Sequence, residues 1–136
     1  MMNIDRAKDM LDEIAEGLPI EFYNELNGGI LLIPESKLSP YAQNSDLWIM
    51  GEYIRSSSMG RMIKIYYGSF ELMYPHLSDG EFREKLRATL LHEFTHHLES
   101  LARERGTAHT RVNLAWAKPT IVGRLRGVAV DRKSVV

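Results

Sequence analysis

The segment LLHEFTHHLES, residues 90–100, places a glutamate and three histidines close together in the chain. His92 and His96 are four residues apart, so on a helix both imidazoles project from one face and can reach the same ion. Glu93 is rotated by about 100° from His92, beside that face, where a carboxylate can hold and deprotonate a metal-bound water. The HExxH pattern therefore predicts zinc bound by His92 and His96, with Glu93 as general base.

The alternative is a solvated helix face that carries histidines but no metal. Random placement of this chain's histidines and glutamates would give an HExxH with a probability of about 0.016. On a helical wheel the apolar positions Phe94 and Leu98 point away from His92, at about 200° and 240°. We therefore expect the two ligand histidines to lie off the core-facing stripe, and we prefer the metal site.

A catalytic zinc site usually has a third protein ligand. Glu99 is the first candidate, because it lies at about −20° on the wheel, close to His92 and His96. Seven residues of helix rise about 10.5 Å, so Glu99 would have to reach back or the helix would have to bend. The alternative for Glu99 is an exposed helix carboxylate. His109, beyond the stop signal Gly106, ranks second, and Glu104, which faces away at about 120°, ranks third.

Four other polar residues have less specific signals. His97 lies at the edge of the apolar stripe and is expected to be a buried or supporting histidine instead of a ligand. His76 precedes the helix and is expected to be a loop residue rather than a transition-state stabiliser. Tyr66 and Tyr67 are adjacent, so on a strand only one of them faces the core. Either hydroxyl could donate to an oxyanion, but core packing and exposure account for them more simply.

Length and composition fit one small folded domain. The 136 residues are 44% hydrophobic and 26% charged, which is ordinary for a globular protein. Without cysteine there is no thiolate ligand, so His, Asp, Glu or water must hold any metal. No apolar run reaches the roughly 20 residues that span a bilayer, and the start, MMNIDRAKDM, lacks the apolar core of a signal peptide. We expect a soluble cytoplasmic protein with no membrane partner.

Hydrophobic periodicity predicts the elements that position the motif. Residues 4–16 form an amphipathic helix that stops at Gly17, and a second short helix begins at Pro19 in PIEFYNEL. Strands are expected at 30–34, 47–54 and 61–67, with a loop over 35–46.

A long helix should begin after Ser78, which with Glu81 forms a capping box, and should continue to about Arg103. Its core-facing stripe consists of Phe82, Leu86, Leu90, Phe94, Leu98 and Leu101. The expected fold is α+β, with a short twisted sheet of about three strands packed on this helix and N-terminal helices beside it.

The chain resembles the small bacterial zincin-like metallopeptidases, a single-domain HExxH family. The resemblance covers roughly residues 10–105, through LPIEFYNELNGGILLIPES, DLWIMGEYI, KIYYGSFELMY and above all LRATLLHEFTHHLESLA. It implies a minimal zincin, a twisted sheet over an active-site helix, with His92 and His96 on zinc and Glu93 as base. In zincins the peptide substrate lies along an edge strand, which here would belong to the hairpin 47–67.

The chain departs from this family after residue 105. Family members continue with further acidic residues and helix, whereas here Asp131 is the only acid after Glu104. If the third ligand normally comes from that region, this chain lacks it. Residues 103–136 carry eight basic residues against Glu104 and Asp131, a balance of +6, while residues 1–102 carry −7. A basic tail can bind nucleic acid, but Trp116 is its only Trp, Tyr or Phe and it holds no motif.

The last residues suggest another origin for this tail. DRKSVV can be back-translated to GATCGGAAGAGCGTCGTG followed by the stop TAG, the sequence of a common short-read sequencing adapter. We therefore expect residues 131–136 to be adapter read-through and much of 106–130 to be frameshifted or chimeric. The coding DNA decides between this hypothesis and a genuine basic tail.

The sequence thus predicts a metallopeptidase domain at 1–105 and a basic tail at 106–136. Zn²⁺ bound by His92, His96 and Glu99 would activate a water, with Glu93 as base, against a peptide or protein substrate. One alternative is a non-catalytic zinc-binding pseudoenzyme with an incomplete metal shell. The other is a nucleic-acid-binding protein that acts through the tail, which we do not favour.

Overall fold

The computed structural model describes residues 2–42, 47–58 and 60–104, so the predicted tail 106–136 lies outside the described residues. The elements follow in the order α1 (Ile4–Glu16), the 3-10 helix η1 (Ile20–Tyr23), β1 (Gly29–Ile33), β2 (Lys37–Leu38), β3 (Trp48–Ile49), β4 (Gly51–Ser56), β5 (Gly60–Tyr66), α2 (Tyr67–Met73) and α3 (Asp79–Glu104). The expected α+β class is confirmed. No helix in these described ranges is long and apolar enough to span a membrane.

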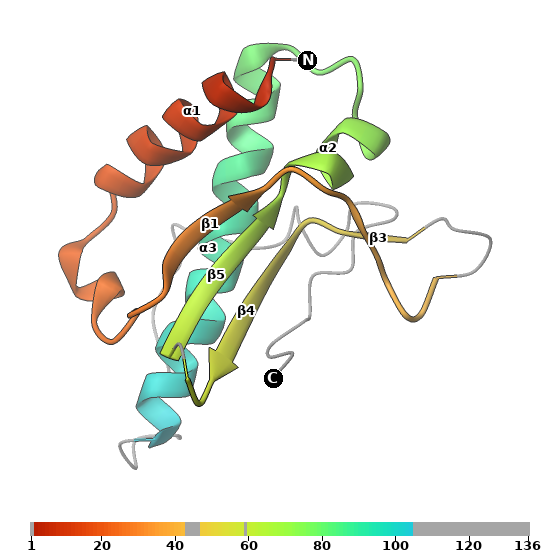
Figure 1. The fold of residues 1–136 in the computed structure, drawn as a ribbon. Coiled ribbons are helices and arrows are strands. Elements are labelled where there is room, and N and C mark those ends of the chain that lie inside the picture. The colour runs from red at the N-terminus through yellow and green to blue at the C-terminus, as the bar shows by residue number, and fades with distance from the viewer. Residues whose placement is uncertain (1, 43–46, 59, 105–136) are drawn as a thin grey trace.

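Three strands form the main sheet, in the order β1-β5-β4. β4 pairs with β5 antiparallel, from Gly51 opposite Ile65 to Ser56 opposite Gly60, and β1 pairs with β5 parallel. Among the described residues, β1 and β4 are therefore the two edges of this sheet. A separate antiparallel pair, β2 and β3, extends beside it. Figure 1 shows α3 running behind the three strands and α1 beside α3.

The core fills the space between the sheet and the two long helices. The amphipathic pattern of α1 buries Ala7, Met10, Leu11 and Ile14. Along α3 the predicted stripe is buried at every position except Leu98, which is partly buried. Since that stripe faces the sheet and α1, the opposite and flanking faces of α3 are available for polar side chains.

Helix caps fix where the two long helices begin. Asn3 accepts a hydrogen bond from the backbone N–H of Arg6 at 2.9 Å and caps α1. Before α3, Ser78 Oγ accepts from the Glu81 N–H at 3.2 Å, and the Glu81 carboxylate accepts from the Ser78 N–H at 2.9 Å. The capping box expected from the sequence is confirmed, and it sets the position of the HExxH segment within α3.

The structure corrects three local predictions. The expected loop 35–46 contains β2, which pairs with β3, and the expected strand 47–54 is divided into β3 and β4. The expected strand 61–67 ends at Tyr66, because Tyr67 begins α2.

The error at Tyr67 has a tertiary cause that no local pattern shows. α2 packs against the segment after β1 so closely that a Cβ on Gly68 would lie 2.5 Å from the Ser36 nitrogen. Tyr67 lies in the main core, where its ring contacts Phe82 of α3, whereas Tyr66 lies in a second cluster with Ile49. The expectation that one of the two faces the main core is therefore met by Tyr67, but Tyr66 is not exposed, since the exposed fractions are 7% for Tyr66 and 6% for Tyr67.

Candidate metal centre

His92 and His96 lie one turn apart on α3 with their ring nitrogens directed at one another. The two Nε2 atoms are 3.2 Å apart, and the ring planes are nearly perpendicular at 88°. Two imidazole nitrogens bound to one tetrahedral zinc at about 2.0–2.1 Å would be roughly 3.3 Å apart. The pair therefore fits a zinc ion. The same separation also suits a hydrogen bond in which one ring donates and the other accepts.

Glu93 is fully buried between α3 and the start of the edge strand β4. A Cβ on Gly51 would lie 3.3 Å from Glu93 Oε2 and 2.8 Å from Thr89 Cγ2. Only a residue without a side chain allows the strand to approach the helix this closely. β4 thus passes directly over the carboxylate that the sequence assigns as general base.

His97 is fully buried and both of its ring nitrogens have partners. Nε2 lies 2.8 Å from the Asn24 carbonyl oxygen, and Nδ1 lies 2.8 Å from the Tyr53 hydroxyl. Because a carbonyl only accepts, Nε2 carries the proton, and in the neutral ring Nδ1 accepts from the hydroxyl. The expectation of a buried histidine is confirmed, and its ring joins α3 to β4 and to the segment after η1.

Arg61, at the start of β5, extends this network. It donates to the Tyr53 hydroxyl at 2.9 Å, to Ser100 Oγ at 2.6 Å and to the Glu104 carboxylate at 2.7 Å. The sequence reading missed Arg61, Tyr53 and Ser100. One signal was present, because His97, Ser100 and Glu104 are spaced i, i+3, i+7 and so share a helix face.

Within the described ranges no third candidate ligand joins His92 and His96. No group of three His, Cys, Asp or Glu side chains there is arranged to hold a metal. Glu99 is exposed, and α3 continues uninterrupted past it. Glu104 is engaged by Arg61, and His109 lies outside the described residues. The structure therefore brings His92 and His96 together but does not add Glu99, whose role as a ligand stays a prediction.

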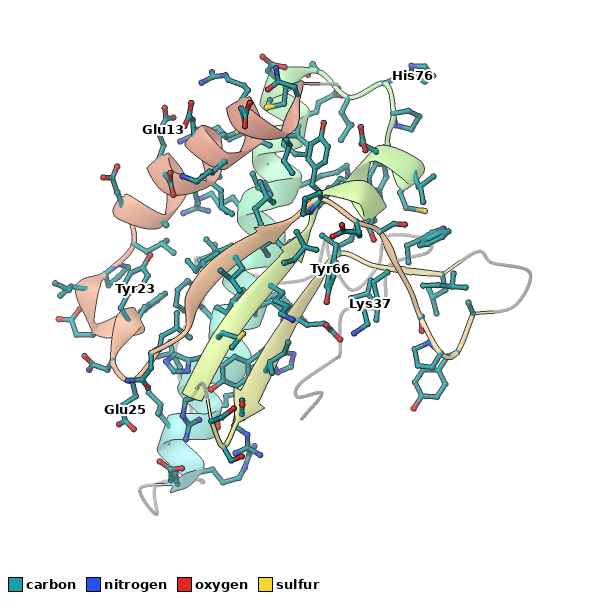
Figure 2. All side chains as sticks on the ribbon, in the orientation of Figure 1. Glu13, Tyr23, Glu25, Lys37, Tyr66 and His76 are labelled. Carbon is teal, nitrogen blue, oxygen red and sulfur yellow. The ribbon has the colours of Figure 1, made fainter. Side chains whose placement is uncertain are left out.

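A second buried carboxylate lies next to Gly51 on the other face of the sheet. Glu52 accepts from Lys37 Nζ at 2.9 Å on both oxygens and from the Tyr66 hydroxyl at 2.6 Å. Burial, followed by the hydrogen bond to Glu52, raises the pKa of Tyr66. Figure 2 shows Lys37 and Tyr66 together in front of the sheet, away from α3. The Tyr66 hydroxyl is thus committed to Glu52, whose ion pair attaches the β2–β3 pair to the edge strand.

His76 is exposed in the loop between α2 and α3, as the sequence indicated. In Figure 2 it lies at the end of the molecule where α3 begins. The HExxH segment lies several turns further along the same helix, so His76 is not part of the metal centre.

Fold and site together define an α+β domain in which an HExxH helix lies beneath the edge strand of a three-stranded sheet. The solved structure of a conserved hypothetical protein from Thermus thermophilus is similar, with 30% sequence identity and a TM-score of 0.61. The match covers 75% of this chain and 99% of that one, and this chain belongs to the same family. No family model and no curated protein matches the chain.

Proposed function

We propose that this protein is a zinc-dependent metallopeptidase in which His92 and His96 bind zinc and Glu93 is the general base. The observation that carries the proposal is the 3.2 Å separation of the two Nε2 atoms on the helix turn that also carries Glu93. Zinc bound there would supply Lewis acidity toward the substrate carbonyl and the attacking water. The remaining steps belong to side chains and backbone groups of this chain.

The burial and packing of Glu93 support its proposed role in proton transfer. Its carboxylate is fully buried and held between α3 and Gly51, so its orientation is restricted before substrate binds. A general base works from such a fixed position, taking the proton of the attacking water and passing it to the leaving amine. Glu93 directly follows His92 in α3, and this adjacency supports the proposal that its carboxylate serves a water held at the histidine pair.

The edge strand β4 supplies a means of placing a peptide. β4 pairs with β5 on one side, and its other side is an edge of the main sheet. Edge strands present backbone N–H and C=O groups that can pair with an extended peptide. Since β4 passes over Glu93 at Gly51, a peptide paired there would run beside the catalytic helix. This supports a peptide or protein substrate.

A second candidate function is a zinc-binding module without turnover. It is favoured by the exposure of Glu99 and by the ion pair that holds Glu104 on Arg61, because both leave the metal shell with two histidines in the described part. Such a module would still bind zinc through His92 and His96.

Hydrolysis of a quenched fluorescent peptide mixture by the full-length zinc-loaded protein tests the proposal. We expect Glu93→Gln to retain zinc and to lose activity by about 10²-fold or more, the usual contribution of a general base. Glu84→Gln, an exposed site on the same helix, is the matched control and should match the wild type. Zinc binding without hydrolysis in the wild type would select the non-catalytic module, and a protein that binds no zinc would contradict both functions.

A further inference from the structure

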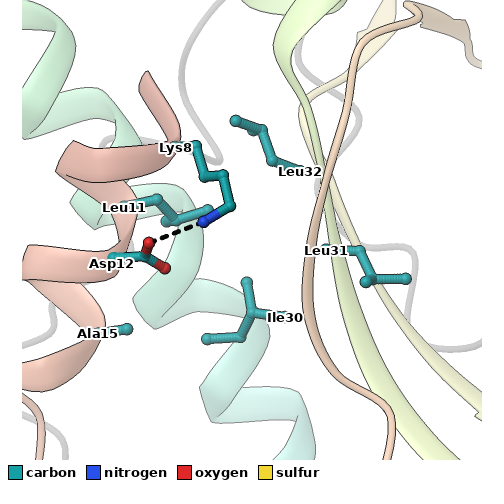
Figure 3. A pocket seen from close by; sticks show the side chains of 7 residues that line it. All are labelled: Lys8, Leu11, Asp12, Ala15, Ile30, Leu31 and Leu32. Carbon is teal, nitrogen blue, oxygen red and sulfur yellow. Dashed lines mark hydrogen bonds and ion pairs between the residues drawn. The ribbon is translucent and has the colours of Figure 1, made fainter. Parts of the chain in front are cut away.

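A groove of about 250 Å³ lies between α1 and β1, at the opposite edge of the sheet from β4. Leu11, Ala15, Ile30 and Leu32 supply its apolar lining, and the exposed ion pair of Lys8 and Asp12 stands at its rim. Figure 3 shows Lys8 opposite Leu32 and Ala15 opposite Ile30. Small-molecule sites usually measure about 300–1,000 Å³. This groove is smaller and suits one or two aliphatic side chains.

The strand that borders the groove is an edge without the usual protection. β1 pairs with β5 on one side and, among the described residues, with no strand on the other. Edge strands are commonly guarded by lysine, proline or a bulge, but β1 reads GILLI and has neither a charge nor a proline. Leu31 at its centre is 39% exposed. The outward backbone groups of β1 are therefore suited to accept another strand.

The helix wall above the groove is acidic. The groove side of α1 is formed by Lys8, Leu11, Asp12 and Ala15. The next positions around the helix, about 60–100° from Lys8, are all exposed acids: Asp5, Glu16 and Asp9. Within α1, all of which the structure describes, Lys8 is the one basic residue on this side, and Asp12 pairs with it at 3.0 Å. The rim thus presents a net negative charge beside an apolar groove.

We propose that the groove between α1 and β1 binds an extended, basic segment of a partner protein as an added strand. The segment pairs with β1, places one aliphatic side chain over Ile30 and Leu32, and directs an arginine or lysine on either side of it to the acids of α1. Long basic side chains can lie along apolar surface while their charged ends reach the rim. The proposal does not depend on the metallopeptidase function, because β1 and β4 are opposite edges of the sheet.

Fluorescence anisotropy with a labelled peptide Arg-Thr-Leu-Thr-Arg and the full-length protein tests this site. In a strand, both arginines and the leucine project to one face, so all three can meet the groove side of α1. We expect saturable binding that weakens with salt. The peptides Glu-Thr-Leu-Thr-Glu and Arg-Thr-Asp-Thr-Arg should each bind about tenfold or more weakly, because the first reverses the charges and the second puts a carboxylate into the apolar groove.

Two protein variants test separately how the rim charge and the space in the groove contribute to peptide binding. Glu16→Lys reverses a rim charge at an exposed helix end, where a cation suits the helix dipole, and should weaken binding about fivefold. Ala15→Arg fills the groove and should abolish binding. Glu21→Lys makes the same charge change on η1, away from the groove, and should bind as the wild type does. Glu93→Gln should also bind normally, which separates this site from the metal centre.

Several outcomes overturn the proposal. Equal binding by the wild type and Glu16→Lys, or an acidic peptide that binds as tightly as the basic one, would remove the charge argument. Absence of binding to the wild-type protein would remove the site. If sedimentation shows self-association that Ala15→Arg abolishes, the occupant of the groove is a second copy of this chain and not a basic partner segment.

Discussion

Gly51 is the residue at which the edge strand and the HExxH helix come closest. The positions of Thr89 and Glu93 leave no room for a side chain, since an added Cβ would lie 2.8 Å from Thr89 Cγ2. At this residue the same contact packs the sheet on α3 and positions the carboxylate of Glu93, the proposed general base. A change of one methyl group at Gly51 should therefore affect stability and, under the proposed function, activity.

We predict that Gly51→Ala lowers the free energy of unfolding by about 1–3 kcal/mol, the usual cost of overpacking. It should also reduce peptide hydrolysis, because Glu93 must shift. Denaturant unfolding and the peptidase assay measure the two effects. Gly80→Ala is the control, since a Cβ there meets nothing within 4 Å in a helix, and it should be neutral or stabilising. A Gly51→Ala protein as stable and active as the wild type would contradict the close approach.

The Tyr53 hydroxyl is the central atom of the buried network that links β4, β5 and α3. It accepts from Arg61 at 2.9 Å and lies 2.8 Å from His97 Nδ1. Tyr53→Phe should cost about 1–3 kcal/mol of unfolding free energy, because Nδ1 loses its hydrogen-bond donor in a dry site. Tyr74→Phe is the matched control, since the Tyr74 hydroxyl is buried and makes no hydrogen bond among the described residues. Its removal should be neutral or stabilising, and equal losses in the two variants would refute this account.

The sequence predicted that the side chains of His92 and His96 lie close together, because their spacing along a helix alone determines this. His92 and His96 face each other because four residues make about one helical turn. It could not predict that Gly51 covers Glu93 or that Arg61 reaches Glu104, because these contacts depend on how strands separated by many residues pack against α3. The helical wheel places Glu99 at nearly the same angle as His92 and His96, but it does not show that Glu99 is displaced from His92 along the helix axis.

The start of α3 controls the position of the whole motif along the helix axis. Ser78→Ala removes one half of the capping box and should lower the unfolding free energy by about 1 kcal/mol. Thermal or urea unfolding at neutral pH measures this. Ser57→Ala, an exposed site in the β4–β5 turn, should leave stability unchanged. No loss in Ser78→Ala would mean that α3 does not depend on this cap.

The other half of the capping box gives a pH dependence. The hydrogen bond from the Ser78 backbone lowers the pKa of Glu81 below its ordinary 4.5. A carboxyl with a lowered folded-state pKa stabilises the fold above its unfolded pKa, and this contribution is lost as pH falls through the folded value. The stability difference between the wild type and Glu81→Gln should therefore be present at pH 7 and shrink below pH 4.5. A difference that grows on acidification would contradict it.

Elements with strong local signals were predicted well. The residues 4–16 expected for the first helix are the bounds of α1, and the capping box located α3. The sequence did not predict β2 and α2, which are short elements that depend on tertiary contacts. β2 exists because it pairs with β3, and α2 begins at Tyr67 because Gly68 allows contact with the segment after β1. Neither contact produces a hydrophobic periodicity that could be recognised in the sequence.

In the whole molecule, the two candidate binding surfaces lie at opposite edges of the main sheet. The β4 edge lies over the HExxH helix, and the β1 edge borders the acidic groove of α1. The proposed hydrolysis at one edge and the proposed docking at the other would therefore use separate surfaces of the chain. The predicted tail 106–136 lies outside the described residues, and sequencing of the coding DNA remains the direct test of its origin.

The number of zinc ions bound per chain is the sharpest test of whether His92 and His96 hold one zinc ion. The full-length protein is loaded with zinc, separated from free metal by gel filtration and analysed for zinc per chain. We predict about one zinc per chain for the wild type and for Glu93→Gln, and close to none for His96→Ala, which removes one of the two ligands. A wild type without zinc, or a His96→Ala variant that retains as much zinc as the wild type, would contradict the assignment.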